Sequence, residues 1–87
     1  MKDVLMMMMA GCPHCRRANQ MLDRLMKEHE EYRSINIRKE DENVNTALAN
    51  SLDYYYVPCF FVNGKKMLEG VPTMETVEAV LKEALAE

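Results

Sequence analysis

Two cysteines separated by two residues, Cys12 and Cys15, are the part of this 87-residue sequence best suited to chemistry. Cys12 lies between Gly11 and Pro13, and proline suits the first turn of a helix. At a helix start, unpaired backbone N–H groups and the helix dipole would stabilise a Cys12 thiolate, whereas Cys15 would lie one turn further in. A pair at this spacing can close a disulfide with little backbone movement. The pattern predicts a redox dithiol, with Cys12 as the exposed nucleophile and Cys15 as the buried resolving cysteine.

The residues around this pair predict the elements that position it. Val4 to Met8 is apolar without alternation, as in a short strand buried on both faces. Tyr32 to Ile37 is interpreted as a second strand, and the polar segment Arg38 to Asn43 as a loop. Between the two strands, apolar residues at helical spacing predict a long amphipathic helix that begins at Pro13. They are Ala18, Met21, Leu22, Leu25 and Met26.

The second half of the sequence predicts a short helix, a hairpin and a final helix. The short helix is expected from Val44 to about Ser51. Asn63-Gly64 favours a type I′ turn between strands at Cys59 to Val62 and Lys65 to Leu68. Thr73 is the expected N-cap of the last helix. Its apolar face would consist of Met74, Val77, Val80, Leu81, Ala84 and Leu85. The expected order is β-α-β-α-β-β-α.

Together these features resemble the thioredoxin superfamily. The resemblance rests on Cys12-Pro13-His14-Cys15 after a buried strand, and on Tyr56-Val57-Pro58 before an aromatic strand and an Asn-Gly turn. The short stretch before the first strand resembles glutaredoxins in particular. The resemblance covers Val4 to Leu85 and implies a single thioredoxin-like α/β domain over residues 1–87. Such a domain has a central four-stranded mixed sheet flanked by three helices.

The resemblance also implies an activity, that of a thiol–disulfide oxidoreductase using Cys12 and Cys15. It implies that the Val57-Pro58 bond is cis and packs against the dithiol, and that the backbone of Val57 pairs with the substrate. The implied substrates are disulfide-containing proteins or small thiols. A reductase or glutathione would be the electron donor.

Some positions depart from the family pattern. Glutaredoxins usually carry Tyr where His14 stands and Thr where Tyr56 stands. They also carry a Gly-Gly-Asp type segment for glutathione where this chain has Glu69-Gly70-Val71-Pro72. The chain has no Trp, whereas thioredoxins carry one before the dithiol. The resemblance therefore does not carry over a glutathione site, and we expect no metal and no cofactor beyond the Cys12–Cys15 disulfide.

Pro13 and His14 are expected to tune the redox potential. The Pro-His pair between the cysteines resembles the residues found at the same place in strongly oxidising members of the superfamily. A donor at His14 would stabilise the Cys12 thiolate, and so the reduced form, which raises the potential. Arg16 and Arg17 add positive charge to the same turn. We expect a couple less reducing than thioredoxin, between about −120 and −270 mV.

Two other functions use the same residues. Cys12 and Cys15 could hold Cu(I) or Zn(II) in a metal-delivery module, or two chains could bridge an iron–sulfur cluster with glutathione. Pro13 stiffens the turn between them, which suits a disulfide better than a metal loop. A third hypothesis is a redox sensor or scaffold that binds a partner through its fold.

The other sulfur-containing residues are interpreted as part of the core. Met6 to Met9 could offer soft ligands to Cu(I), but consecutive residues of a strand face opposite sides, so they cannot all converge on one ion. We therefore expect them to fill the core. Cys59 follows the predicted cis-proline and is interpreted as an inert core cysteine.

Composition and charge exclude some classes of binding partner. The net charge is −3, and Lys and Arg are scattered among Glu and Asp, so no basic stripe points to nucleic acid. No run approaches the ~20 apolar residues of a membrane span. Met9-Ala10-Gly11-Cys12 resembles a lipoprotein cleavage site, but the apolar stretch before it is shorter than the usual ~7 to 15 residues of a signal core. We expect a cytoplasmic monomer.

Overall fold

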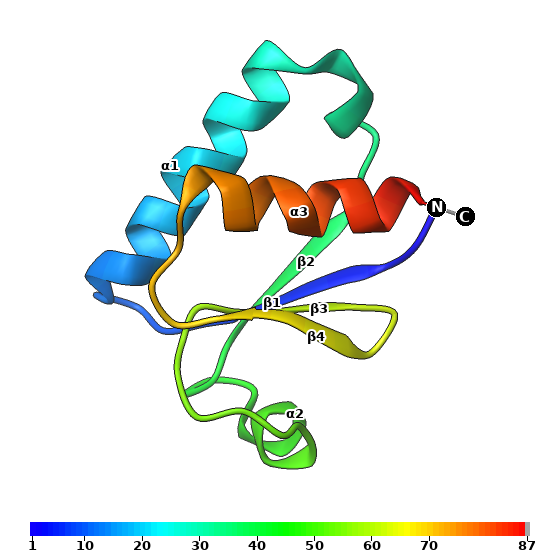
Figure 1. Ribbon diagram of the computed structural model, residues 1–87. Coiled ribbons are helices and arrows are strands. Elements are labelled where there is room, and N and C mark those ends of the chain that lie inside the picture. Colours follow the sequence, from blue (N-terminus) through cyan, green and yellow to red (C-terminus); the bar gives the residue numbers. More distant parts are fainter. Residues whose placement is uncertain (87) are drawn as a thin grey trace.

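Four strands form one mixed sheet in the order β2-β1-β3-β4 in the computed structural model, which describes residues 1–86 (Figure 1). β1 (Val4–Met8) is central and pairs parallel with β2 (Ile37–Asp41). It pairs antiparallel with β3 (Cys59–Val62), which in turn pairs antiparallel with β4 (Lys65–Glu69). The expected thioredoxin-like α/β order and mixed sheet are confirmed.

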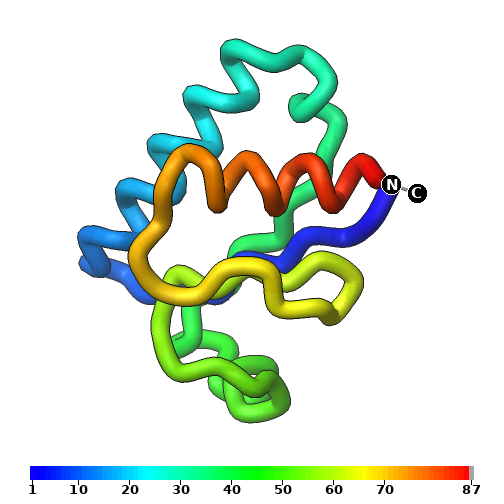
Figure 2. Tube along the Cα trace, viewed as in Figure 1, coloured from blue at the N-terminus to red at the C-terminus, as the bar shows by residue number. Residues whose placement is uncertain are grey.

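Helices cover both faces of this sheet. α1 (Pro13–Glu28) and α3 (Met74–Leu85) lie on one face, and the short α2 (Thr46–Ser51) lies on the other (Figures 1 and 2). None of the helices within residues 1–86 is long and apolar enough to cross a membrane. The three helices complete the architecture that the resemblance implies.

The two faces of the sheet bury separate apolar clusters because neighbouring strand residues point to opposite sides. Met6 and Phe60 pack beneath α1 and α3, together with residues such as Leu22 and Val77. Met7 belongs to the cluster on the other face, where it is buried with Cys59 and Phe61. The partly buried residues that pack against this cluster are Leu5, Leu48, Ala49, Leu52, Tyr54 and Val57. Met6 and Met7 are both fully buried and Met8 packs against the first cluster, so these three methionines serve as core, as expected. Met9 belongs to neither cluster.

Local signals locate the starts of α1 and α3 and the hairpin correctly, whereas α2 begins at Thr46 and not at Val44. α1 buries Cys15, Ala18, Leu22 and Leu25 along one face. Thr73 caps α3: its hydroxyl accepts from the Thr76 backbone N–H, and the Thr76 hydroxyl accepts from that of Thr73. Asn63 and Gly64 have φ values of 47° and 81°, the two positive angles that a type I′ turn needs.

The prediction for the second strand was wrong in its position. Tyr32 ends a 3₁₀ helix, η1 (Glu30–Tyr32), and the strand is Ile37–Asp41, most of which was expected to be a loop. β2 is an edge strand that pairs parallel with β1, from Val4 opposite Ile37 to Met8 opposite Asp41. Its side chains are largely polar, as is common at sheet edges, so they carry no apolar alternation to reveal it.

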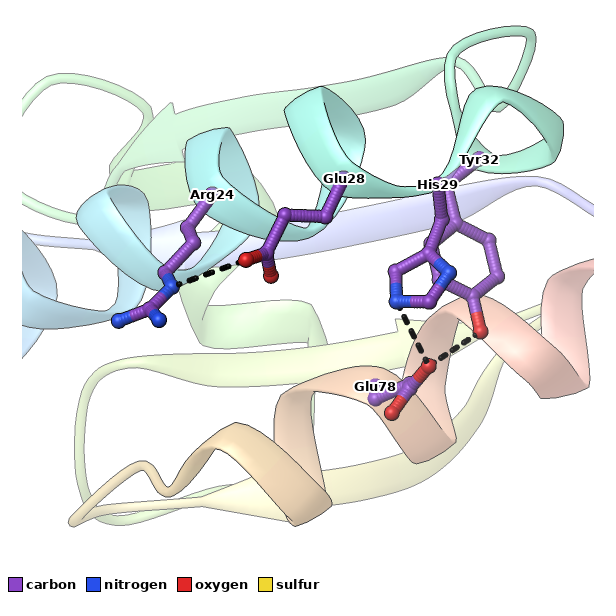
Figure 3. Close-up of polar contacts among 5 residues, drawn as sticks. All are labelled: Arg24, Glu28, His29, Tyr32 and Glu78. Atoms are coloured by element: carbon purple, nitrogen blue, oxygen red, sulfur yellow. Dashed lines mark hydrogen bonds and ion pairs between the residues drawn. The ribbon is translucent and has the colours of Figure 1, made fainter.

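A polar contact joins η1 to α3 and fixes the C-terminal end of α1 (Figure 3). The Tyr32 hydroxyl donates to Glu78 Oε2 at 2.7 Å, and His29 Nε2 lies 3.9 Å from the same oxygen. Arg24 and Glu28 pair along the exposed side of α1. Burial and the Glu78 carboxylate raise the pKa of Tyr32 to about 12, so the phenol remains a donor at neutral pH.

This contact predicts the stability of a conservative variant. Tyr32→Phe removes the hydroxyl of a residue that is 3% exposed, and should lower the free energy of unfolding by about 1 kcal/mol. Tyr55→Phe is the matched control because Tyr55 is 83% exposed, and it should change nothing measurable. Denaturant unfolding of both variants makes the comparison, and equal stability would show that the Tyr32–Glu78 bond contributes nothing.

Candidate functional site

The sheet register brings the dithiol loop and the Val57-Pro58 bond to one end of the sheet. Met7, near the end of β1, lies opposite Cys59, the first residue of β3. The segment after β1 and the segment before β3 therefore leave the sheet side by side (Figures 1 and 2). The Val57-Pro58 peptide is cis, as the resemblance implies. Cys12 and Cys15 lie in the loop and first helical turn that follow β1 at this same end of the sheet.

Cys12 is the N-cap of α1. Its backbone is extended, with φ −82° and ψ 118°, and its sulfur accepts a hydrogen bond from the Cys15 N–H at 3.4 Å. Its carbonyl accepts from Arg16 N–H at 3.0 Å, so the first helical bond forms here. Cys12 is half-buried, whereas Cys15 is only 2% exposed. Pro13 occupies the first helical position, as expected.

The two thiols differ in acidity as well as exposure. Burial alone would raise the pKa of Cys12, but hydrogen bonds from the Cys15 thiol and from the N–H groups of Cys15 and His14 outweigh it and lower the pKa. Burial and the hydrogen bond to Cys12 together raise the pKa of Cys15 to about 12. At neutral pH the arrangement therefore favours a thiolate at Cys12 and a protonated thiol at Cys15.

His14 contributes to this turn through its backbone. Its N–H donates toward the Cys12 sulfur, while its ring Nδ1 contacts the Arg17 guanidinium. Arg16 and Arg17 are both exposed. The structure thus places backbone donors at the Cys12 sulfur, while the His14 imidazole contacts Arg17 and makes no hydrogen bond to that sulfur.

Cys59, the first residue of β3, is shielded from solvent. It is fully buried in the cluster with Met7 and Phe61, and burial raises its pKa to about 12. This environment is that of an inert core thiol.

A hollow of about 300 Å³ opens beside the dithiol, between the loop after β1 and the first turns of α1. Both cysteines line it, together with Asn19, one turn beyond Cys15. The Oδ1 of Asn19 is buried and accepts no hydrogen bond from the described residues. A larger hollow of about 410 Å³ lies at the far end of β1, around Asp3 and Asn63, and contains neither cysteine of the pair.

Asp41 supports the dithiol loop and was not singled out from the sequence. One carboxylate oxygen accepts from the Ala10 N–H at 3.1 Å, two residues before Cys12, and the other accepts from the Asn43 N–H at 2.8 Å. The parallel pairing of β1 with β2 places Asp41 beside Met8, at the start of this loop. No sequence signal marks it, because the polar sequence of the strand that carries it predicts a loop.

Possible metal ligands are few around the dithiol. Within residues 1–86, no group of three or more His, Cys, Asp or Glu side chains could hold a metal ion together. Met6 and Met7 belong to clusters on opposite faces of the sheet, so they cannot bind one ion together.

Comparisons with known proteins agree with this architecture. Residues 4–67 match the family model described as Glutaredoxin. The oxidised thioredoxin from Plasmodium falciparum is similar in structure, with a TM-score of 0.73 and 16% identity over 98% of this chain and 82% of that one. A structure described as a malarial protein is similar over 98% of each chain, with a TM-score of 0.71 and 20% identity. At these identities the structural likeness shows the fold alone. No curated protein sequence matches the chain.

The differences among the thiols predict their reactivity. In the reduced native protein, iodoacetamide should alkylate Cys12 first, because its lowered pKa and half-exposed sulfur provide accessible thiolate. The Cys12 rate should rise with pH and level off below the pH expected for an ordinary thiol, whose pKa is about 8.5. Cys15 and Cys59 should react only slowly until the protein unfolds. Peptide mass mapping against time and pH measures this, and alkylation of Cys59 as fast as Cys12 would contradict the core assignment.

Proposed function

The chain belongs to the glutaredoxin family, and on that premise we propose that it catalyses thiol–disulfide exchange through Cys12 and Cys15. One observation carries the proposal: a half-exposed N-cap cysteine of lowered pKa lies directly beside a buried cysteine of raised pKa. An attacking thiol needs to be ionised and accessible, and a resolving thiol needs to lie next to it and stay protonated until the mixed disulfide has formed. The pair meets both needs.

The first step is attack by the Cys12 thiolate on one sulfur of a substrate disulfide. The substrate S–S bond breaks as the new bond forms, and one substrate thiolate leaves. The negative charge moves from the α1 N-terminus to the leaving sulfur. The product is a mixed disulfide between Cys12 and the remaining half of the substrate.

The second step uses Cys15. Its thiol loses a proton and attacks the Cys12 sulfur, which expels the second substrate thiolate and closes the Cys12–Cys15 disulfide. Two electrons have then passed from the protein dithiol to the substrate, and solvent protonates the released thiolates. Loss of the hydrogen bond to the Cys12 thiolate favours this step, because that bond helps to keep Cys15 protonated before the mixed disulfide forms. The reverse sequence oxidises a dithiol.

Val57 and Pro58 are proposed to receive the substrate. Within residues 1–86, the backbone N–H and carbonyl of Val57, which precedes the cis bond to Pro58, make no hydrogen bond. An extended segment that carries the disulfide could pair with them as an added strand. We propose disulfide-containing proteins or small thiols as substrates and a reductase or glutathione as the electron donor. No cofactor beyond the internal disulfide is needed.

Trapping the intermediate tests the exchange mechanism. Cys15→Ser should accumulate a mixed disulfide at Cys12 when mixed with a disulfide substrate, because the second step is blocked. Cys12→Ser should trap nothing, and Cys59→Ala should cycle like the wild type. Intact-mass spectrometry detects the adducts, with metal analysis of freshly purified wild type alongside. Stoichiometric copper, zinc or iron without a trapped adduct would favour the metal-delivery alternative instead.

Equilibration with a glutathione redox buffer tests the tuning proposed for Pro13 and His14. The wild-type potential should lie between about −120 and −270 mV. His14→Ala should be more reducing, because it removes the imidazole and its contact with Arg17 from the turn that carries Cys12, while the backbone N–H remains. His29→Ala is the matched control at the other end of α1 and should leave the potential unchanged. A wild-type value below that of thioredoxin would refute the proposed tuning.

A further inference from the structure

Two side chains of β4, Lys66 and Glu69, hold the segment that leads into the cis-proline. The Glu69 carboxylate accepts hydrogen bonds from the backbone N–H groups of Tyr55 and Tyr56, the second at 2.9 Å. Lys66 Nζ lies 3.0 Å from the other Glu69 oxygen and donates to the Asp53 carbonyl at 3.2 Å. We call this pair of residues, Lys66 and Glu69, the β4 clasp.

The clasp acts on backbone next to the proposed substrate-pairing residue. Tyr56 directly precedes Val57, and on the other side the Pro58 carbonyl accepts from Gly70 N–H at 2.9 Å. The end of β4 therefore holds the chain both before and after Val57. The segment between α2 and β3 has no regular secondary structure, so these contacts, together with the packing of Tyr54 and Val57 on the core, hold it in place.

The Glu69 carboxylate of the clasp is ionised around neutral pH, where the Cys12 thiolate is expected to react. The two backbone N–H groups, and then Lys66, hold the pKa of Glu69 at about 2. A lowered pKa means that the ionised Glu69 carboxylate stabilises the folded protein. This contribution to stability is complete above the usual pKa range of carboxyl groups, and it is lost as the pH falls toward the lowered pKa of Glu69. Around neutral pH the clasp is therefore constant.

The clasped segment presents an apolar surface beside Val57. Tyr55, Tyr56 and Val71 are three of the five exposed large hydrophobic residues of residues 1–86. A Cβ built on Gly70 would lie 3.9 Å from the Tyr56 Cβ, so Tyr56 and the turn after β4 are neighbours. A polypeptide with apolar side chains near its disulfide could cover this surface, whereas a small polar disulfide would leave most of it exposed.

We propose that Glu69 is a positioning residue, which holds the Val57 backbone ready to pair with an extended polypeptide segment that carries the substrate disulfide. This inference rests on the proposed thiol–disulfide exchange and names its substrate class. A preordered edge binds such a segment with less loss of conformational freedom than a loose one. A disulfide without a backbone to pair has no use for this ordering.

Two probes with the same leaving group separate this role from general damage. Both are mixed disulfides of 2-nitro-5-thiobenzoate, one with a short cysteine peptide that has an apolar residue beside the cysteine, and one with mercaptoethanol. The protein carries Cys15→Ser, so that each reaction stops at the Cys12 adduct. Release of the coloured thiolate gives the maximal rate and the half-saturation concentration.

Glu69→Ala should raise the half-saturation concentration for the peptide probe roughly tenfold, because two backbone donors lose their acceptor, with the maximal rate retained. The mercaptoethanol probe and iodoacetamide should react with Cys12 at unchanged rates. Glu69→Gln retains an acceptor oxygen and should recover most of the binding. Glu83→Ala is the matched control, because Glu83 also pairs with a lysine, Lys2, at 3.0 Å but lies on α3.

Lys66→Met provides a milder second variant if Glu69→Ala does not fold. Lys66 is exposed, and its removal should weaken peptide binding about twofold through the lost Asp53 contact. Equal peptide binding by wild type and the clasp variants would overturn the inference, as would an equal loss with both probes. Failure of the unsubstituted clasp protein to react with either probe would instead refute thiol–disulfide exchange itself, and the inference with it.

Discussion

The N-terminus of α1 is the feature on which the proposed chemistry depends. Cys12 caps the helix with its sulfur, so backbone N–H groups that have no partner inside the helix stabilise a thiolate there. The same turn buries Cys15 one step along the helix. One piece of backbone geometry therefore makes two chemically similar side chains unlike in pKa and exposure. That difference gives each cysteine of the pair a separate part in disulfide exchange.

The sheet brings a second chain segment to the same end of the molecule as the two thiols. β1 carries the chain to the dithiol, and antiparallel pairing returns β3 from the same end, with the cis Val57-Pro58 bond just before it. Parallel pairing brings β2 there as well, so that Asp41 supports the loop before Cys12. The site thus depends on strand register, because a slip of one residue would exchange the faces of Met6, Met7 and Cys59.

Patterns local in sequence led to correct predictions, and patterns that depend on distant partners did not. The helical spacing after Pro13, the Asn63-Gly64 turn and the Thr73 cap each involve interactions within a few residues, and each was found as expected. β2 was misplaced because an edge strand with polar side chains is defined by backbone pairing to β1. The roles of Asp41 and Glu69 escaped for the same reason, since their partners lie 31 and 13 to 14 residues away.

The sequence by itself determined the element order, the Cys-Pro-His-Cys turn at a helix start and the family that these features resemble, because such signals come from short-range sterics and hydrophobic periodicity. Only the tertiary structure decided the strength of the difference between Cys12 and Cys15, the support of the dithiol loop by Asp41 and the clasp on the segment before Val57. Burial and long-range hydrogen bonds arise when the strands come together, and no local pattern encodes them. The chemical groups are thus local, while their environments are properties of the assembled sheet.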